Sequence, residues 1–206
     1  MSHTDVLHAV TAQRLIAIVR AGSAGDALEI GSRLLAAGVR AVEVSLVTPD
    51  ALDVIRALVG LAPSGAYIGV GTALTAHDVQ RADAAGARFV VSPGLSADVV
   101  RATREQNLIS VPGAATVTEA LTARDLGAHL VKIFPASTWS PGAVRDVLAS
   151  LPGLPLVPTG GISLDSAPEW IAAGASAVGL GGALTKAAAG PDDMLAGLLR
   201  RLAAPD

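Results

Sequence analysis

The chain has 206 residues, which fits one domain and is long enough to bury a sizeable core. Apolar residues make up 51% and aromatic residues 2%, so aliphatic side chains must build the interior. A net charge of −3 with scattered arginines gives no basic surface for nucleic acid. The absence of cysteine excludes disulfides and thiol chemistry, and we expect the protein to work in a reducing cytoplasm.

The sequence gives no sign of a membrane segment or a metal site. No uncharged apolar run reaches the 18 or so residues that a transmembrane helix needs, and residues 1–10 lack the basic start of a signal peptide. The histidines, at positions 3, 8, 77 and 129, are far apart and have no neighbours at ligand spacing. We therefore expect no membrane partner, no bound metal and no cofactor.

A weak repeat of helix, glycine, short link and apolar strand runs along the chain. It is visible in AAGVRAVEVSL (36–46), AAGARFVVSPG (84–94), LGAHLVKIFPA (126–136) and AAGASAVGLGG (172–182). Amphipathic stretches lie between these segments. The candidate N-cap residues of the helices predicted there are Ser23, Thr75, Ser96 and Thr116.

The apolar runs predict eight strands, each followed by a helical segment. In chain order they lie at about 15–20, 39–46, 66–72, 88–92, 108–112, 130–134, 155–159 and 177–181. Continuously apolar strands that alternate with helices indicate a parallel sheet covered on both faces. Eight such units predict an α/β fold, a closed (β/α)8 TIM barrel that forms one domain over residues 1–206. The alternative, an open doubly wound sheet, would need fewer strands and a GxGxxG loop after the first strand, which the sequence lacks.

Lys132 is the most informative residue at a predicted strand end. It is one of only two lysines and lies in the apolar run LVKIFPA, where an unpaired ammonium group is costly to bury. A buried lysine can lose its proton and attack a carbonyl, whereas an arginine cannot. The structural alternative is an interior lysine satisfied by a carboxylate.

Glu43 is the only acid inside a predicted strand, and it provides such a carboxylate. The second and sixth strands of an eight-stranded barrel face each other, so Glu43 and Lys132 can both reach its axis. Burial raises the pKa of a carboxyl group and lowers that of an amine, while their attraction opposes both shifts. The pair suits imine chemistry, with Lys132 as nucleophile and Glu43 moving protons; a buried ion pair without chemistry is the alternative.

The other strand ends predict a site for an anionic substrate. Arg20 could hold a substrate carboxylate and Thr72 could donate to it, although Arg20 could equally be a surface arginine paired with an acid. Phe134 is a candidate wall beside the lysine or a core residue, and Pro93 ends the fourth strand at the edge of the substrate site. The last two strand ends carry glycine pairs that could hold a phosphate through backbone N–H groups: Gly160, Gly161, Gly181 and Gly182.

Together, the motifs GVRAVEVSLVTP, IGVGTAL, FVVSPGL, VKIFPAS and VPTGGI resemble one enzyme family over residues 14–185. They are similar to the 2-keto-3-deoxy-6-phosphogluconate (KDPG) and 6-phosphogalactonate aldolases, a group that includes 4-hydroxy-2-oxoglutarate aldolases. The resemblance implies a metal-independent class I aldolase with a Schiff base on Lys132 and with Glu43 as acid and base through a water molecule. It also implies a homotrimeric barrel that releases pyruvate and glyceraldehyde 3-phosphate from a phosphorylated 2-keto-3-deoxy sugar acid.

Three positions bear on specificity within that family, and the chain departs from the family pattern at two of them, Val47 and Ala183. Val47 replaces an arginine of the phosphogluconate branch, which leaves Arg20 as the carboxylate ligand of the phosphogalactonate branch. Thr159, in PTGGI, resembles the phosphogluconate branch, and Ala183 replaces a serine that often follows the second glycine pair. The preferred C4 epimer therefore stays open, as does the use of unphosphorylated keto acids. An isomerase, epimerase or synthase of a phosphorylated small molecule, and a phosphosugar-binding subunit without activity, are the rival interpretations.

Overall fold

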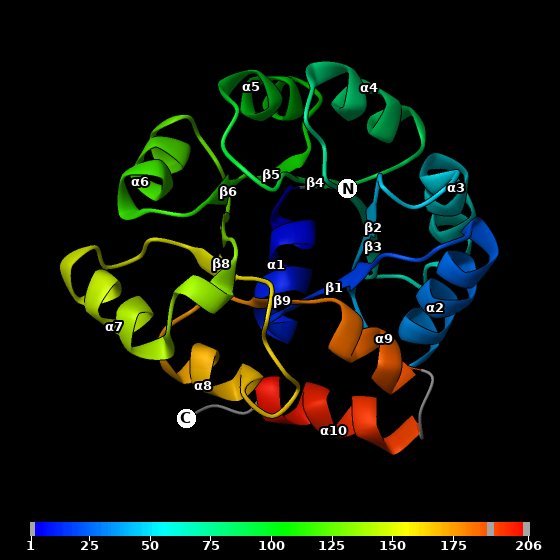
Figure 1. Ribbon diagram of the computed structural model, residues 1–206. Coiled ribbons are helices and arrows are strands. Elements are labelled where there is room, and N and C mark those ends of the chain that lie inside the picture. Colours follow the sequence, from blue (N-terminus) through cyan, green and yellow to red (C-terminus); the bar gives the residue numbers. More distant parts are fainter. Residues whose placement is uncertain (1–2, 189–191, 204–206) are drawn as a thin grey trace.

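The computed structural model describes residues 3–188 and 192–203, as strands that alternate with helices (Figure 1). The strands are β1 (Leu15–Val19), β2 (Ala41–Ser45), β3 (Tyr67–Gly71), β4 (Phe89–Val91), β5 (Ile109–Val111), β6 (Gly113–Ala114), β7 (Val131–Ile133), β8 (Leu156–Pro158) and β9 (Val178–Leu180). The predicted domain over 1–206 also takes in residues 1–2, 189–191 and 204–206, which lie outside the described residues.

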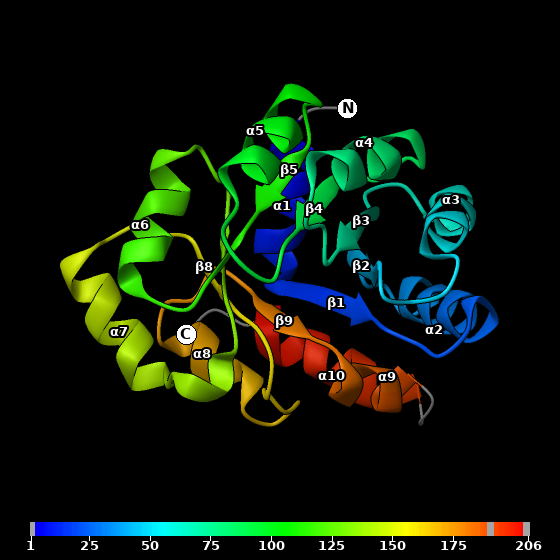
Figure 2. The ribbon, with the colours of Figure 1, turned by 45° about the horizontal axis from the view of Figure 1, so that its top comes forward.

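Apart from α1, which lies in the centre of the ring, the helices surround the strands on the outside (Figures 1 and 2). They are α1 (His3–Gln13), α2 (Ala24–Ala36), α3 (Ala51–Leu61), α4 (Ala76–Ala84), α5 (Ala97–Glu105), α6 (Val117–Asp125), α7 (Pro141–Ser150), α8 (Ala167–Ala172), α9 (Gly182–Ala188) and α10 (Asp192–Ala203), with a 3-10 turn η1 (Ala136–Thr138). No helix in the described ranges is long and apolar enough to cross a membrane.

All strand pairs are parallel, as predicted. One sheet has the order β5-β4-β3-β2-β1-β9 and a second has the order β6-β7-β8. Each predicted strand is present, and the fifth is split into β5 and β6 at Pro112, which has no backbone N–H to donate. Pro112 still accepts a bond from the backbone of Lys132 at 2.9 Å, and a single bridge between Thr159 and Gly179 connects β8 with β9. The α/β fold with parallel strands is therefore confirmed.

The strands bury both of their faces in two separate cores. Because side chains alternate along a strand, residues such as Val42 and Val44 point to the helices, and Ala41 and Glu43 to the other side. The inner core consists of residues from six strands, of the residues just before β7 and β9, and of residues from α1, which packs on the first residues of the strands through Val6, Ala9 and Val10. The helix α1 covers the amino-terminal end of the strands, so a substrate site belongs at the carboxyl end.

The four predicted N-caps are present, and they fix where the helices begin. The side chain of each cap accepts a bond from the backbone N–H three residues later, as Ser23 does from Asp26 at 3.1 Å. Thr75 and Thr116 also form capping boxes, in which the acid at the third position bonds back to the cap. Each of these caps is the residue directly before its helix, so the helix begins where the loop after the strand ends.

Candidate active site

A cavity of 580 Å³ lies at the carboxyl ends of β1, β7, β8 and β9. It brings together eight of the eleven predicted site residues: Arg20, Lys132, Phe134, Thr159, Gly160, Gly161, Gly181 and Gly182. These residues come from four strand ends that are far apart in the sequence. The predicted site residues outside the lining are Glu43, Thr72 and Pro93.

Lys132 points into the cavity from the middle of β7. Its side chain lies on the same face of the strand as Leu130 of the inner core, and the residue is only 7% exposed. The Nζ atom lies 4.9 Å from the centre of the Phe134 ring, close enough for a cation–π contact. Phe134 is thus both a wall of the cavity and a neighbour of the amine.

Glu43 lies on β2, is not part of the cavity lining, and is 2% exposed. Burial raises the pKa of its carboxyl group, and the positive charges of Lys132 and then Arg20 partly oppose this rise. Glu43 is therefore within electrostatic reach of both cations. In the part of the chain that the structure describes, Glu43 and Lys132 form no direct ion pair within 4.0 Å.

A glycine on the neighbouring strand makes room for the Glu43 carboxylate. A Cβ atom added to Gly71 would overlap with Oε1 of Glu43, so any larger residue would displace the acid. The same arrangement recurs at Gly179, whose missing side chain makes room for Thr159. Glycines in strands mark such close approaches, and here they place polar groups on the inner face of the sheet.

Thr72 and Pro93 follow the ends of β3 and β4 and do not line the cavity. Thr72 is half-buried, and its Oγ1 atom lies 2.8 Å from Oγ of Ser45. The backbone of Pro93 packs directly against Gly113, where a Cβ atom would overlap with the proline carbonyl group. The structure therefore places both residues next to β2 and β6, near the strand that carries Glu43 and the one that precedes Lys132.

Two glycine loops form the far side of the cavity. Gly160 and Gly161 have φ of +91° and +81°, a conformation that favours glycine, and a Cβ at either position would press on Phe134 or Ser137 at 3.2 Å. Gly182 is the first residue of α9. Both loops thus present backbone without side chains toward the cavity.

Four further residues line the cavity that the sequence did not single out, which are Ile18, Ile162, Ser163 and Gly179, and Ala183 lines it as well. Ile18 lies two residues before Arg20 and Gly179 two before Gly181, so the two-residue period of a strand could have identified them. Ile162 and Ser163 follow the first glycine pair in a loop, where no periodic pattern applies. Ser163 also bonds with Ser166 at the start of α8.

The described residues contain no group of three or more His, Asp or Glu side chains that could hold a metal ion. The chemistry that the cavity can perform with its own groups is nucleophilic attack by a buried amine, assisted by a nearby carboxyl group.

A comparison with protein-family models identifies one match, described as "Aldolase: KDPG and KHG aldolase", over residues 6–195. The chain belongs to this aldolase family. A relative from Rhizobium meliloti (strain 1021), the probable 2-dehydro-3-deoxy-6-phosphogalactonate aldolase, is 36% identical over 93% of this chain and 91% of its own length. The 2-dehydro-3-deoxy-6-phosphogalactonate aldolase of Escherichia coli (strain K12) is 34% identical over 84% of this chain and 85% of its own length.

Solved structures of the same family share the fold. One titled "Native KDPGal structure" superposes with a TM-score of 0.82 at 31% identity and covers 91% of this chain and 95% of its own. The KDPG aldolase of Legionella pneumophila, with pyruvate captured as a covalent carbinolamine, has a TM-score of 0.81 at 26% identity, over 97% and 98% of the two chains. A thiamine phosphate pyrophosphorylase from Pyrococcus furiosus, at 19% identity and a TM-score of 0.71 over 94% and 98% of the two chains, shares the fold alone.

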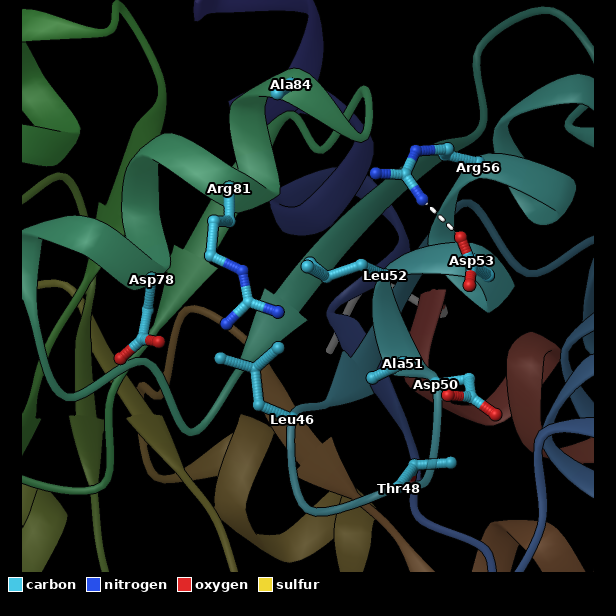
Figure 3. A pocket seen from close by; sticks show the side chains of 10 residues that line it. All are labelled: Leu46, Thr48, Asp50, Ala51, Leu52, Asp53, Arg56, Asp78, Arg81 and Ala84. Carbon is cyan, nitrogen blue, oxygen red and sulfur yellow. Dashed lines mark hydrogen bonds and ion pairs between the residues drawn. The ribbon is translucent and has the colours of Figure 1, made fainter.

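A second hollow of 580 Å³, between α3 and α4, contains none of the predicted site residues (Figure 3). Arg81 extends from α4 toward Leu46, and Arg56 forms an ion pair with Asp53 on α3. Of the acids around this hollow, Asp53 pairs with Arg56, and Asp78 accepts a bond from the backbone N–H of Thr75 in the capping box of α4. Asp50 is at the N-cap position of α3 without a side-chain cap bond. No lysine lines this hollow, which sets it apart from the cavity at Lys132.

Proposed function

We propose that this protein is a class I aldolase that cleaves a 2-keto-3-deoxy-6-phospho sugar acid to pyruvate and glyceraldehyde 3-phosphate. The family membership and the relatives named above support the activity. The site is assigned from one observation: Lys132 is only 7% exposed and lines a cavity at the carboxyl ends of the strands. A rigid strand beside a wall of low polarity suits an amine that must attack as the neutral form.

In this mechanism the Lys132 amine attacks the C2 ketone of the substrate and forms a carbinolamine. Loss of water gives an imine, which withdraws electrons from the C3–C4 bond. A base removes the proton of the C4 hydroxyl, the C3–C4 bond breaks, and the aldehyde leaves while C3 keeps the electron pair as an enamine. Protonation of C3 and hydrolysis of the imine then release pyruvate and restore the lysine.

Glu43 is the group that moves these protons in our proposal. Burial raises the pKa of its carboxyl group above the ordinary value, so the group binds a proton more readily than an exposed glutamate and can give one as well as take one. Within the residues that the structure describes, Glu43 forms no direct ion pair with Lys132, which fits transfer through a water molecule rather than by direct contact.

Arg20 holds the carboxylate of the substrate, with Thr72 and Pro93 at the same edge of the site. Arg20 lines the cavity and is the second cation that acts on Glu43. Position 47 supplies no second arginine, since it is Val47. The phosphate at the other end of the substrate binds the backbone N–H groups of the two glycine loops, Gly160–Gly161 and Gly181–Gly182. Thr159 and Phe134 line the space between these ends.

Replacement of Arg20 by alanine should raise KM for pyruvate in the condensation direction by about 10- to 100-fold, because one charge-assisted contact is lost. The melting temperature should change little, since Arg20 is exposed. Steady-state kinetics with pyruvate as the varied substrate measure the effect, with Arg33→Ala on the neighbouring helix α2 as the control. An unchanged KM would assign carboxylate binding to other groups.

The two sheets form one closed (β/α)8 barrel in this proposal, and residues 1–206 form one domain. Two observations support closure: β5 and β6 are consecutive parts of one run, and the Thr159–Gly179 bridge connects β8 with β9. The inner core, which contains residues from both sheets, also fits a single barrel.

We further propose that the protein is a homotrimer of the cytoplasm. Val47 and Leu74, which follow the paired strands β2 and β3, are 59% and 61% exposed, and the mean hydropathy of +0.52 is high for a monomer. Light scattering after gel filtration should give three times the chain mass of 20.5 kDa. The double substitution Val47→Asp and Leu74→Asp should lower that mass; a wild-type protein that elutes as a monomer would refute the proposal.

The experiment that tests the function is borohydride reduction in the presence of pyruvate, followed by intact-mass and peptide mass spectrometry. We expect one reduced pyruvyl group per chain, on Lys132. Turnover of both C4 epimers of the phosphorylated sugar acid, measured side by side, then identifies the preferred substrate. Folded protein without an adduct would favour an isomerase or synthase that uses Lys132 and Glu43 only as acid and base.

A further inference from the structure

Ser45 is a buried polar residue that the mechanism above does not use. It is the last residue of β2, is 0% exposed, and lies on the same face of the strand as Glu43. Its Oγ atom lies 2.8 Å from Oγ1 of Thr72, the residue directly after β3. The register of the two strands pairs Ser45 with Gly71, so the contact joins adjacent strand ends.

The backbone at Thr72 is in an unusual conformation for its residue type. Its φ of +62° is in the left-handed region, which glycine and asparagine adopt readily and β-branched residues avoid. Such conformations persist where surrounding contacts hold them, and they cluster at functional sites. A threonine here therefore requires contacts that hold it, and the bond to Ser45 is one of them.

The Ser45–Thr72 pair is adjacent to the proton-transfer group. The carboxylate of Glu43, two residues before Ser45, occupies the space over Gly71, the residue before Thr72. Two hydroxyl groups that share one hydrogen bond have one donor and one acceptor. If Ser45 donates to Thr72, the proton of Thr72 is left to donate to another acceptor in the site.

We propose that Ser45 is a positioning residue that fixes the Thr72 hydroxyl as a donor to the carboxylate of the bound keto acid. The inference rests on the proposed aldolase function. In this proposal Ser45 does not contact the substrate. Ser45 fixes the direction in which the Thr72 hydroxyl donates its proton, and it holds the turn that contains Thr72. Loss of the Ser45 hydroxyl should then weaken keto-acid binding more than it slows the chemical step.

The test is a double-substitution cycle with Ser45→Ala and Thr72→Val, read by the pyruvate concentration that half-saturates borohydride trapping and by kcat and KM. Ser45→Ala should raise the half-saturating concentration about 3- to 10-fold, the value of one hydrogen bond. Thr72→Val should cause a similar rise, and the double variant should be no worse than Thr72→Val alone. Ser45→Thr, which keeps a hydroxyl group, should restore binding.

Three controls keep the result specific. Ser110→Ala removes a buried serine on β5 that points away from the inner core, and it should leave pyruvate binding unchanged. Ser45→Cys keeps the volume in a chain with no other cysteine, and it replaces Ser45→Ala if the alanine variant fails to fold. Thermal melting shows that each variant is folded.

Each outcome supports or overturns the proposal. A wild-type protein that forms no pyruvate adduct overturns it together with the aldolase function. The role of Ser45 alone is overturned by a different result. In that case the wild type forms the adduct, and Ser45→Ala, or Ser45→Cys in its place, is half-saturated at the same pyruvate concentration as the wild type. Effects of Ser45 and Thr72 that simply add would show that the two hydroxyl groups act independently, which also refutes it.

Discussion

Lys132→Arg should abolish aldol cleavage, with a fall in kcat of at least about 10⁴-fold. Arginine keeps the positive charge and much of the length of the side chain, but it stays protonated and cannot form the imine. The variant should bind no pyruvate covalently, so that borohydride treatment leaves its mass unchanged. Initial rates of cleavage and intact-mass spectrometry measure the two effects.

The chain offers a matched control for this substitution, since its only other lysine is Lys186. Lys186 is exposed on α9 and does not line the cavity, so Lys186→Arg should keep both the adduct and the activity. Circular dichroism and thermal melting must show that the Lys132 variant is folded. A folded Lys132→Arg protein that still cleaves substrate would remove the nucleophile from the mechanism.

Much of the fold follows from local patterns in the sequence. The apolar runs are short, and four of the helices begin at a predicted Ser or Thr cap such as Thr75 or Thr116, so the starts of these helices could be placed closely. The division of the fifth strand was not predicted, although Pro112 provides the signal. The helix α1 was also not among the predicted elements, because its packing on the strand ends depends on tertiary contacts.

The candidate site was predictable where a strand end determines the position of a side chain. Lys132 and Arg20 point into one cavity because both lie on the inner face of parallel strands that end at the same level. The contact between Ser45 and Thr72 was not predictable, since it depends on a left-handed turn at Thr72. The space that Gly71 leaves for Glu43 depends likewise on strand register, which the sequence does not specify.

Glu43→Gln should lower kcat by about 10²- to 10⁴-fold, the usual contribution of a general acid or base. Glutamine has nearly the same shape and fits the space beside Gly71, so the fold should be kept. The variant should still form the Lys132 adduct, only more slowly, which separates proton transfer from nucleophilic attack. Single-turnover trapping with borohydride measures that rate, and Glu105→Gln, on the exposed end of α5, is the control.

The same substitution should change stability in a pH-dependent manner. Burial raises the pKa of Glu43 above its ordinary value of 4.5, so the folded protein binds this proton more tightly than the unfolded chain. The stabilising contribution of Glu43 is therefore complete below pH 4.5 and is lost as the pH rises through the folded pKa. Glutamine has no charge to bury, so its melting temperature relative to the wild type should increase with pH over this range.

Melting curves between pH 4 and pH 8 would test that sign directly. We expect Glu43→Gln to be more stable than the wild type near pH 8, while its kcat is far lower, because the acid is retained for proton transfer at a cost in stability. A variant that is less stable than the wild type at pH 8 would show that Lys132 and Arg20 stabilise the ionised carboxylate more than burial disfavours it. Glu43 would then be part of a structural ion pair, which is the alternative interpretation of its position.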